Sequence, residues 1–387
     1  MPEPLPDPAP AGLRADDLRA RFDAHASCTV GLEEELMVLD AATLDLVPVA
    51  DELLGAPPLA GDARFKRELP AAQVEIAAPP AASVGEAAGL LAAARRDLVA
   101  AAGPRLAFAA AGVHPFAAEE GELNRGAVYD RTRSEYGLVA RRQLVFGLHV
   151  HVAVQGAERA MAVYNGLRSL LPELAALGAN GAFHGGRDTG LASIRPLISR
   201  MLPRQGVPPA LSSLEAYIRA LAWGAAAGAL PSAAQWWWEL RLHPLHGTVE
   251  VRVPDAQATV AEAAAVAAVV HALVGALAAG ELAPPVADTW RIEENRWSAC
   301  RHGVEGTLAD LVTGARTPAR ERLHALLDAV APAAARLGCA AELADAHALA
   351  ERNGALRQRA VAASAEPRDG RGARAVAEDL VARFLAS

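Results

Sequence analysis

The chain has 387 residues, of which 52% are hydrophobic, and its formal net charge at pH 7 is -8. This size and composition allow a large buried core. The acidic balance argues against a protein that binds nucleic acid. The three cysteines Cys28, Cys300 and Cys339 form no metal-binding or disulfide pattern, which fits a reducing cytoplasm.

The two ends of the chain differ in character. Residues 1–25 are rich in proline and acidic side chains, so we expect a flexible lead that carries a short amphipathic helix over residues 16–25. Residues 26–387 contain no linker rich in glycine, serine and proline between their motifs. We therefore expect them to form a single domain with additional helices at the C-terminal end.

Five short segments are predicted to be β-strands with a polar and an aliphatic face. In residues 28–40, Glu33 and Glu35 project the same way because side chains alternate along a strand. The other four segments show the same alternation. Their polar residues are Gln73 and Glu75; His149 and His151; Glu239, Arg241 and His243; and Glu250 and Arg252.

Carboxylates and imidazoles that converge on one sheet repel or desolvate one another unless cations compensate. Such a face suits hard divalent metals and a polyanion that they bridge. Each segment alone is also typical of an ordinary antiparallel strand with one dry and one wet face. The set favours a site because lysine is almost absent from these outward positions. Lys66 is the only lysine of the chain, which we interpret as the mark of a GC-rich genome with little functional meaning.

The remaining pattern predicts helices over residues 83–102, 157–177, 212–227 and 259–280. The last of these is apolar enough to suggest a membrane span, but it is mostly alanine and contains Glu262 and His271. We expect it to be a buried helix, with no membrane contact. Residues 178–195 are too polar and too long for a simple connection, so we expect a functional loop. The whole is α+β, with a mostly antiparallel sheet and helices away from its polar face.

Seven motifs follow one another in a recognisable order. They are 29–35 (TVGLEEE), 68–76 with the proline pair 79–80, 112–116 (GVHPF), 147–152 (GLHVHV), 186–190 (GRDTG), 248–252 (TVEVR) and 295–303 (NRWSACRHG). Over residues 28–355 the chain thus resembles the carboxylate–amine ligase family, also called type 2 glutamate–cysteine ligases, of the glutamine synthetase-like superfamily. The segment before 186–190 departs from the family pattern, and we expect residues 178–190 to border the substrates and to close over the intermediate.

The resemblance implies a catalytic domain with a curved antiparallel sheet whose polar face lines the active site. It implies an ATP- and Mg²⁺-dependent ligase, with Mn²⁺ as an alternative ion. A small carboxylate would become an acyl phosphate, and an amine would then form an amide of γ-glutamyl type. Glutamate–cysteine ligase activity, a cytoplasmic location and a homodimer or larger assembly are the corresponding expectations. Phosphoryl transfer needs positioning and charge neutralisation, which these residue types supply.

The resemblance also implies roles for single residues. Glu250, Arg252 and Arg195 would act in catalysis, and Arg252, Arg241 and Arg187 would contact the nucleotide. The expected metal ligands are Glu33, Glu35, Glu68, Glu75, His149 and Glu250.

Simpler roles stay open for four neighbours of these residues. Glu34 points to the opposite face and is a candidate partner for an arginine, and Glu68 is equally well read as a solvated turn residue. His151 would serve as an outer hydrogen-bond partner of the site, and His114 as a structural turn residue.

Two other functions remain open on the residues alone. One is a metal-dependent amide hydrolase or phosphotransferase that keeps the cations and changes the reaction. The other is a binding protein that keeps the fold without turnover. ATP dependence and the fate of phosphate separate these from a ligase.

Overall fold

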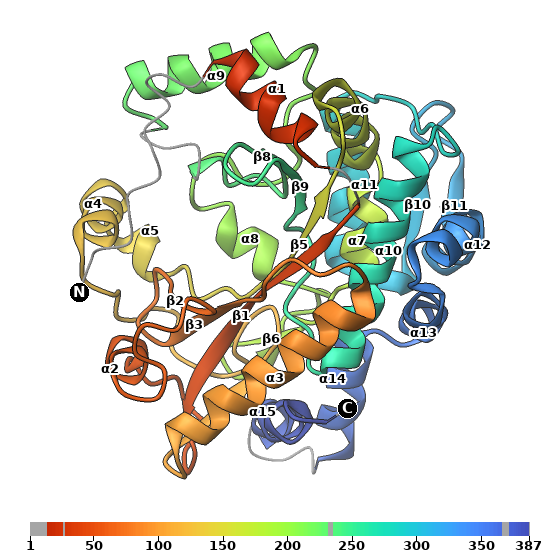
Figure 1. Ribbon diagram of the computed structural model, residues 1–387. Helices are drawn as coiled ribbons and strands as arrows, with labels where there is room; N and C mark the ends of the chain where they lie inside the picture. Colours follow the sequence, from red (N-terminus) through yellow and green to blue (C-terminus); the bar gives the residue numbers. More distant parts are fainter. Residues whose placement is uncertain (1–13, 26–27, 231–234, 366–370, 387) are drawn as a thin grey trace.

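The computed structural model describes residues 14–25, 28–230, 235–365 and 371–386 (Figure 1). Its centre is a seven-stranded sheet in the order β2-β3-β1-β5-β9-β8, with β4 also paired to β1. Neighbouring strands of this sheet run antiparallel. The strands are β1 (Val30–Asp40), β2 (Phe65–Arg67), β3 (Gln73–Ala77), β4 (Leu106–Ala109), β5 (Leu148–Ala153), β8 (Leu240–His243) and β9 (Thr248–Val251).

Two short hairpins and a series of helices surround the sheet. The hairpins pair β6 (Phe183–His184) with β7 (Arg187–Asp188) and β10 (Thr307–Ala309) with β11 (Arg316–Pro318). The α-helices are α1 (Ala15–Asp23), α2 (Ala50–Gly55), α3 (Val84–Ala102), α4 (Ala127–Tyr136), α5 (Leu138–Arg141), α6 (Ala157–Arg168), α7 (Leu171–Leu177), α8 (Arg195–Ser199), α9 (Leu214–Ala226), α10 (Val260–Ala278), α11 (Thr289–His302), α12 (Ala319–Leu337), α13 (Ala340–Glu351), α14 (Gly354–Ser364) and α15 (Arg371–Arg383), and a 3₁₀ turn spans Gly303–Glu305.

The helices cover the apolar face of the sheet. α3 packs on β1, α6 on β8 and β9, and α10 on β5, while α12 and α13 form a further layer behind α10. The strands contribute fully buried aliphatic side chains to this core, such as Leu32, Leu36, Val74, Val150 and Val251. The polar residues of the same strands therefore lie on the opposite face, as the alternation predicts. The predicted α+β architecture is confirmed.

The apolar helix predicted over residues 259–280 is α10. Thr259 and Glu262 form a capping box that fixes its start. It is the one helix in the described part of the chain that is long and apolar enough to cross a membrane, and 72% of that stretch is buried inside the protein. Its hydrophobicity is thus explained by its place between the sheet and the outer helices.

Two predicted segments differ from the structure. Residues 157–177 form two helices, α6 and α7, because Pro172 lacks a backbone N–H and restricts Leu171, so a helix restarts there. Residues 1–13 of the expected flexible lead lie outside the described residues. Within the rest of that lead, Leu18 and Phe22 of α1 are fully buried against the main body. The division of the chain at residue 25 stays a prediction.

A buried ion pair ties the helical layer to β1. The Arg95 guanidinium donates to both Glu34 carboxylate oxygens, at 2.8 and 2.6 Å, and both side chains are fully buried. The remaining Arg95 donors bind the carbonyl oxygens of Gln257, Ala258 and Phe384. The prediction that Glu34 faces away from the site and pairs with an arginine is confirmed.

Replacing Arg95 by methionine leaves the Glu34 carboxylate buried without its cation. We expect the free energy of unfolding to fall by about 3–5 kcal/mol, which is typical when one partner of a buried pair is removed. Urea unfolding followed by circular dichroism measures this loss. Arg96→Met is the matched control, because Arg96 is exposed on the same helix and should change stability by less than about 0.5 kcal/mol. An Arg95 variant as stable as the control would contradict the interpretation.

Candidate active site

The polar face of the sheet arranges its charged residues in rows across the strands. In one row, Lys66 of β2 lies opposite Glu75 of β3, which lies opposite Glu35 of β1. In the next row, Glu33 of β1 is paired with His149 of β5. Residues from strands far apart in sequence thus meet because register fixes which side chains are neighbours.

The third row lies toward the other edge of the sheet. His151 of β5 is opposite Glu250 of β9, and Glu250 is opposite Arg241 of β8. The Arg241 guanidinium hydrogen-bonds Glu250, and Arg252 Nη1 donates to the second Glu250 oxygen at 2.6 Å. The predicted shared face of Glu250, Arg241 and Arg252 is present.

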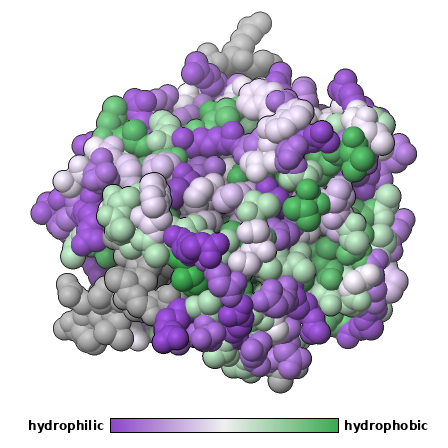
Figure 2. All heavy atoms as spheres, turned by 90° about the horizontal axis from the view of Figure 1, so that it is seen from above, coloured by the Kyte–Doolittle hydropathy of each residue, from purple (hydrophilic) through white to green (hydrophobic). Residues whose placement is uncertain are grey.

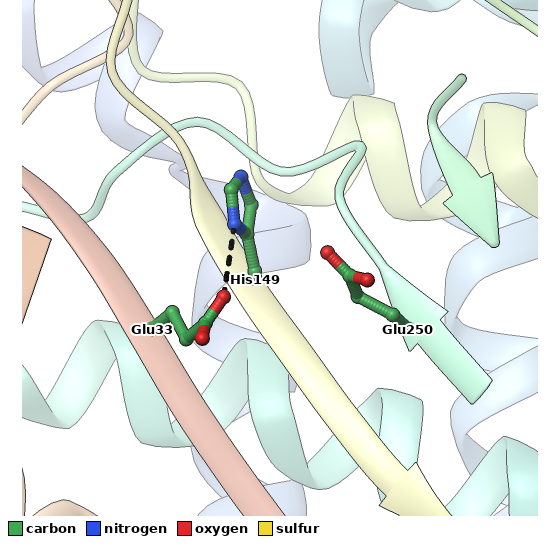
Figure 3. A group of neighbouring side chains, drawn as sticks. All are labelled: Glu33, His149 and Glu250. Carbon is green, nitrogen blue, oxygen red and sulfur yellow. Dashed lines mark ion pairs between the residues drawn. The ribbon is translucent and has the colours of Figure 1, made fainter. Parts of the chain in front are cut away.

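Two groups of potential ligand atoms form on this surface. One consists of Glu33, His149 and Glu250, and the other of Glu35, Glu75 and His149; within each group the atoms lie within 4.8 Å of one another. Figure 3 shows the first group, with side chains from β1, β5 and β9 directed toward a common point. His149 belongs to both groups. Five of the six predicted metal ligands are therefore brought together.

His149 is suited to act as a neutral ligand. It is buried, its Nδ1 lies 3.6 Å from Glu33 and its Nε2 lies 4.0 Å from Glu35. Burial, and after it the positive charge of Arg252, lowers the pKa of His149. Nε2 makes no hydrogen bond within the described residues. A buried imidazole with a lowered pKa, and with one nitrogen that has no hydrogen-bond partner among the described residues, suits the neutral form that binds metals.

The carboxylates of the face divide into two electrostatic classes. Burial alone would raise the pKa of Glu250, but Arg241 and Arg252 hold it well below the usual range. Burial and the neighbouring Glu33 raise the pKa of Glu75 to about 7, although Lys66 opposes the shift. Burial together with Glu75 and Glu35 raises the pKa of Glu68 well above its usual value. On the β3 side of the face, burial and neighbouring carboxylates thus both oppose the ionisation of Glu68 and Glu75.

Glu68 itself stands slightly apart from the ligand groups. It follows β2, is half-buried, and belongs to neither of the two groups among the described residues. Its raised pKa shows that it lies within electrostatic reach of Glu75 and Glu35. A role for Glu68 as a metal ligand stays a prediction.

Arg195 holds the backbone beneath the site. It begins α8, and its guanidinium donates to the carbonyl oxygens of Arg252, Val253 and Pro254 at 3.2–3.3 Å. A side chain on Gly147 would meet this guanidinium, since an added Cβ would lie 2.2 Å from Arg195 Nη2. The glycine of the GLHVHV motif therefore leaves room for the Arg195 guanidinium, which would have to shift if a larger residue stood there. This position of Arg195 is fixed by tertiary contacts that the sequence does not show.

A polar cavity opens beside the ligand groups, between β1, β5 and α8. Arg195, Arg252 and His149 border it, so the predicted catalytic arginines face the same space. Sequence reasoning missed several of its residues, which come from the short helix α8 and from loops without a periodic pattern. The cavity is lined by Glu35, Gln143, Val145, His149, Arg195, Pro196, Ser199, Gln205, Gly206, Trp237, Glu239 and Arg252.

Other predicted site residues lie elsewhere or have structural roles. Arg187 is exposed on the β6–β7 hairpin and is not among the residues that line the cavity. His114 is buried, accepts from the backbone of Ala117 at 2.8 Å and contacts the Leu44 carbonyl, which fits a structural turn residue. His151 Nε2 lies 3.2 Å from Glu33, and its Nδ1 contacts Thr248 at 3.0 Å.

The loop expected to close over the site is in large part packed. Residues 178–183 are buried, and Asn180 is held by Asp255, Gln358 and the carbonyl oxygen of Ala256. Exposed residues begin at Gly185. The exposed hairpin is also held, by the hydrogen bond from the Gly186 N–H to the Pro115 carbonyl and by the Asp188–Arg359 ion pair. The family-deviating segment packs against the chain that follows β4 and β9, where Asn180 binds the carbonyl groups of Ala110 and Ala256. Closure of residues 178–190 over the site stays a prediction.

Replacing Arg195 by methionine removes three hydrogen bonds from buried carbonyl groups. We expect a loss of about 2–4 kcal/mol in the free energy of unfolding, because bonds from a charged donor are among the stronger ones. Arg187→Met is the control and should change stability by less than about 0.5 kcal/mol. Equal urea midpoints for the two variants would show that Arg195 does not hold the backbone.

Comparisons with known proteins point to one family. The model of a family described as glutamate-cysteine ligase family 2 matches residues 29–378. A Rubrobacter xylanophilus protein with the provisional name glutamate–cysteine ligase 2-3 is 40% identical over 357 residues, covering 89% of this chain and 95% of its own. A similarly named protein of Pseudomonas paraeruginosa is 39% identical over 362 residues, covering 92% and 94%.

Solved structures of low sequence identity share the fold. The glutamate–cysteine ligase of Francisella tularensis in complex with AMP superimposes with a TM-score of 0.66 at 13% identity, covering 93% of this chain and 89% of its own. The ligase PafA of the prokaryotic ubiquitin-like protein Pup gives a TM-score of 0.52 at 12% identity, covering 92% and 72%. The predicted glutamine synthetase-like fold is confirmed.

Proposed function

Because the chain belongs to glutamate–cysteine ligase family 2, we propose that it is an ATP- and Mg²⁺-dependent ligase that joins a small carboxylate to an amine. The observation that carries the proposal is the pair of ligand groups sharing His149, with Arg252 beside them. The names of the relatives make glutamate and cysteine the first substrates to test. A nucleotide site agrees with the AMP in the structural relative from Francisella tularensis.

The residues present fit hard divalent cations. The two groups offer carboxylate oxygens, which are the ligands typical of Mg²⁺ and Mn²⁺, together with one imidazole nitrogen. The Nε2 atom of His149 is buried and has no hydrogen-bond partner among the described residues, as expected for an atom whose partner is a metal ion. Glu33, Glu35, Glu75, His149 and Glu250 would hold the cations. When bound, the cations neutralise the negative charge of the phosphate groups.

The arginines of the site would neutralise phosphate oxygens that the cations do not contact. Arg252 lies at the border of the cavity, 2.6 Å from Glu250 and 3.4 Å from His149. The Arg252 guanidinium can donate hydrogen bonds to a phosphate oxygen while Glu250 holds the guanidinium in place. Arg241 is more deeply buried than Arg252 and also hydrogen-bonds Glu250, so we assign it to positioning Glu250.

The reaction proceeds in two displacements on this surface. An oxygen of the substrate carboxylate attacks the γ-phosphorus of ATP, which forms an acyl phosphate and releases ADP. The amine then attacks the acyl carbon, the C–O bond to phosphate breaks, the amine nitrogen loses a proton, and an amide and inorganic phosphate result. The adjoining cavity, with Gln143, Ser199 and Gln205, offers hydrogen-bonding groups for the acid or the amine.

The decisive experiment measures ADP and phosphate release with Mg²⁺ and ATP, using amino acids alone and in pairs with amines, glutamate with cysteine included. We expect release that requires both an acid and an amine. If the acid carries ¹⁸O in its reacting carboxylate, one ¹⁸O atom should appear in the released phosphate. That transfer identifies the acyl phosphate, because a direct route would leave the phosphate unlabelled.

Three other outcomes would overturn the proposal. Amide cleavage without nucleotide would identify a hydrolase, and phosphate transfer without amide formation would identify a phosphotransferase. The absence of both nucleotide binding and turnover across the panel would identify a binding protein. The cytoplasmic location and a homodimeric or larger assembly stay predictions, which fractionation and sedimentation would test.

Glu250→Gln removes the negative charge of one ligand carboxylate. His149→Ala removes the imidazole that both ligand groups share. We expect ADP formation to fall by about 10²–10³-fold or more in each variant, the usual effect of losing one major electrostatic contact at a reacting phosphate. Circular dichroism should stay native. His302→Ala, an exposed position at the end of α11, should retain full activity. Wild-type turnover in either site variant would refute the assignment of these residues.

A further inference from the structure

The only lysine of the chain lies at the ligand groups. Of the 37 lysine and arginine residues, Lys66 is the single lysine. Its Nζ lies 3.1 Å from Glu75 and 3.2 Å from Glu33. Composition explains why arginine is used elsewhere, but it does not explain an exception at this one place. The earlier interpretation of Lys66 as uninformative therefore needs revision.

The ammonium group bridges both ligand groups at once. Glu33 belongs to one group and Glu75 to the other, and Lys66 contacts a carboxylate oxygen of each. Lys66 contacts Oε1 of Glu33, whereas Oε2 of Glu33 is the oxygen next to His149. A divalent cation held by either group would lie close to the ammonium and would be repelled by it. The lysine and the cations are therefore alternative counter-charges for the same carboxylates.

Lys66 is placed so that it can leave. It lies on β2, which forms the edge of the sheet, and 47% of its side chain is exposed, against 7% for Glu75 and 18% for Glu33. A flexible four-carbon stem at an edge strand can turn to solvent without moving the backbone. The carboxylates, by contrast, are fixed by burial in the centre of the face.

An arginine would not serve the same purpose. A guanidinium binds carboxylates through two parallel hydrogen bonds, as Arg95 does with Glu34, and such forks are strong and directional. An ammonium is a compact point charge with rotatable donors, so it exchanges more easily with another cation. The other buried carboxylates described above, Glu34 and Glu250, are paired with arginine.

We propose that Lys66 is an exchangeable internal counter-ion, which neutralises Glu33 and Glu75 in the metal-free protein and is displaced when divalent cations bind. This inference rests on the metal site of the proposed function and adds a competitor to it. The lysine keeps the carboxylates from repelling one another while the cations are absent, and it sets the cation concentration at which the site fills.

Chemical labelling tests the displacement directly. Sulfo-NHS acetate modifies amines, and in this chain only Lys66 and the α-amino group qualify, so peptide mass spectrometry reads both rates in one sample. We expect saturating Mn²⁺ to accelerate labelling of Lys66 about five- to tenfold, since an ion pair of this kind is modest in strength and is then broken. The α-amino group is the internal control, and its rate should not change.

Binding of Mn²⁺, measured from the electron paramagnetic resonance signal of the free ion, supplies the second test. Lys66→Met should lower the Kd by about five- to tenfold, because no ammonium has to leave. Lys66→Arg should raise it, because the fork holds the carboxylates. Arg67→Met is the matched control with an unchanged Kd, since Arg67 is the next residue and pairs with Asp51 instead.

The outcomes separate this inference from the proposed function. If Mn²⁺ binds but neither the labelling rate of Lys66 nor the Kd of Lys66→Met changes, the lysine is a static ion pair and the inference is wrong. If wild-type protein binds no Mn²⁺, the metal site of the proposed function fails as well. A lower unfolding midpoint for Lys66→Met, without tighter Mn²⁺ binding, would also contradict the exchange of Lys66 with cations. It would show that Lys66 only stabilises the fold.

Discussion

Repulsion between carboxylates on one face of a sheet is the constraint that organises this protein. Strand alternation sends Glu33, Glu35, Glu75 and Glu250 to the same side, and register brings them within a few ångströms. Such a surface is stable only if charge is neutralised locally. Arginines serve Glu250, a lysine serves Glu33 and Glu75, and a buried imidazole lies between the two groups.

The helical side of the sheet makes this arrangement possible. Because α3, α6 and α10 bury the aliphatic face, the strands cannot rotate or slip to relieve the repulsion, since a slip by one residue would turn valine and leucine outward. Glu34, the one acid of the triplet on the wrong side, is fully compensated by Arg95. On the face shown in Figure 2, hydrophilic and hydrophobic residues are interspersed without a comparable order.

Much of the site was predictable because a period of two is visible in the sequence. The faces of Glu33, Glu75, His149 and Glu250 follow from alternation alone, and the motif order predicts the family. Three features did not follow. The break between α6 and α7 was missed although Pro172 marks it. The place of Arg195 depends on carbonyl groups some 57 residues away along the chain. Lys66 looked uninformative because its partners, nine and 33 residues distant, meet it only through sheet pairing.

The contacts of Arg95 also have a consequence for the order in which the protein can be made. Its carbonyl partners at Gln257, Ala258 and Phe384 lie 162, 163 and 289 residues after it in the sequence. A nascent chain can pair β1 with β3 early, but the pocket that holds Glu34 is complete only after Phe384 has been synthesised. The strand that carries Glu33 and Glu35 is therefore covered from behind by a segment that is made much later. A chain that stops before Phe384 would leave the interior of the sheet exposed, which gives quality control a means to recognise incomplete copies.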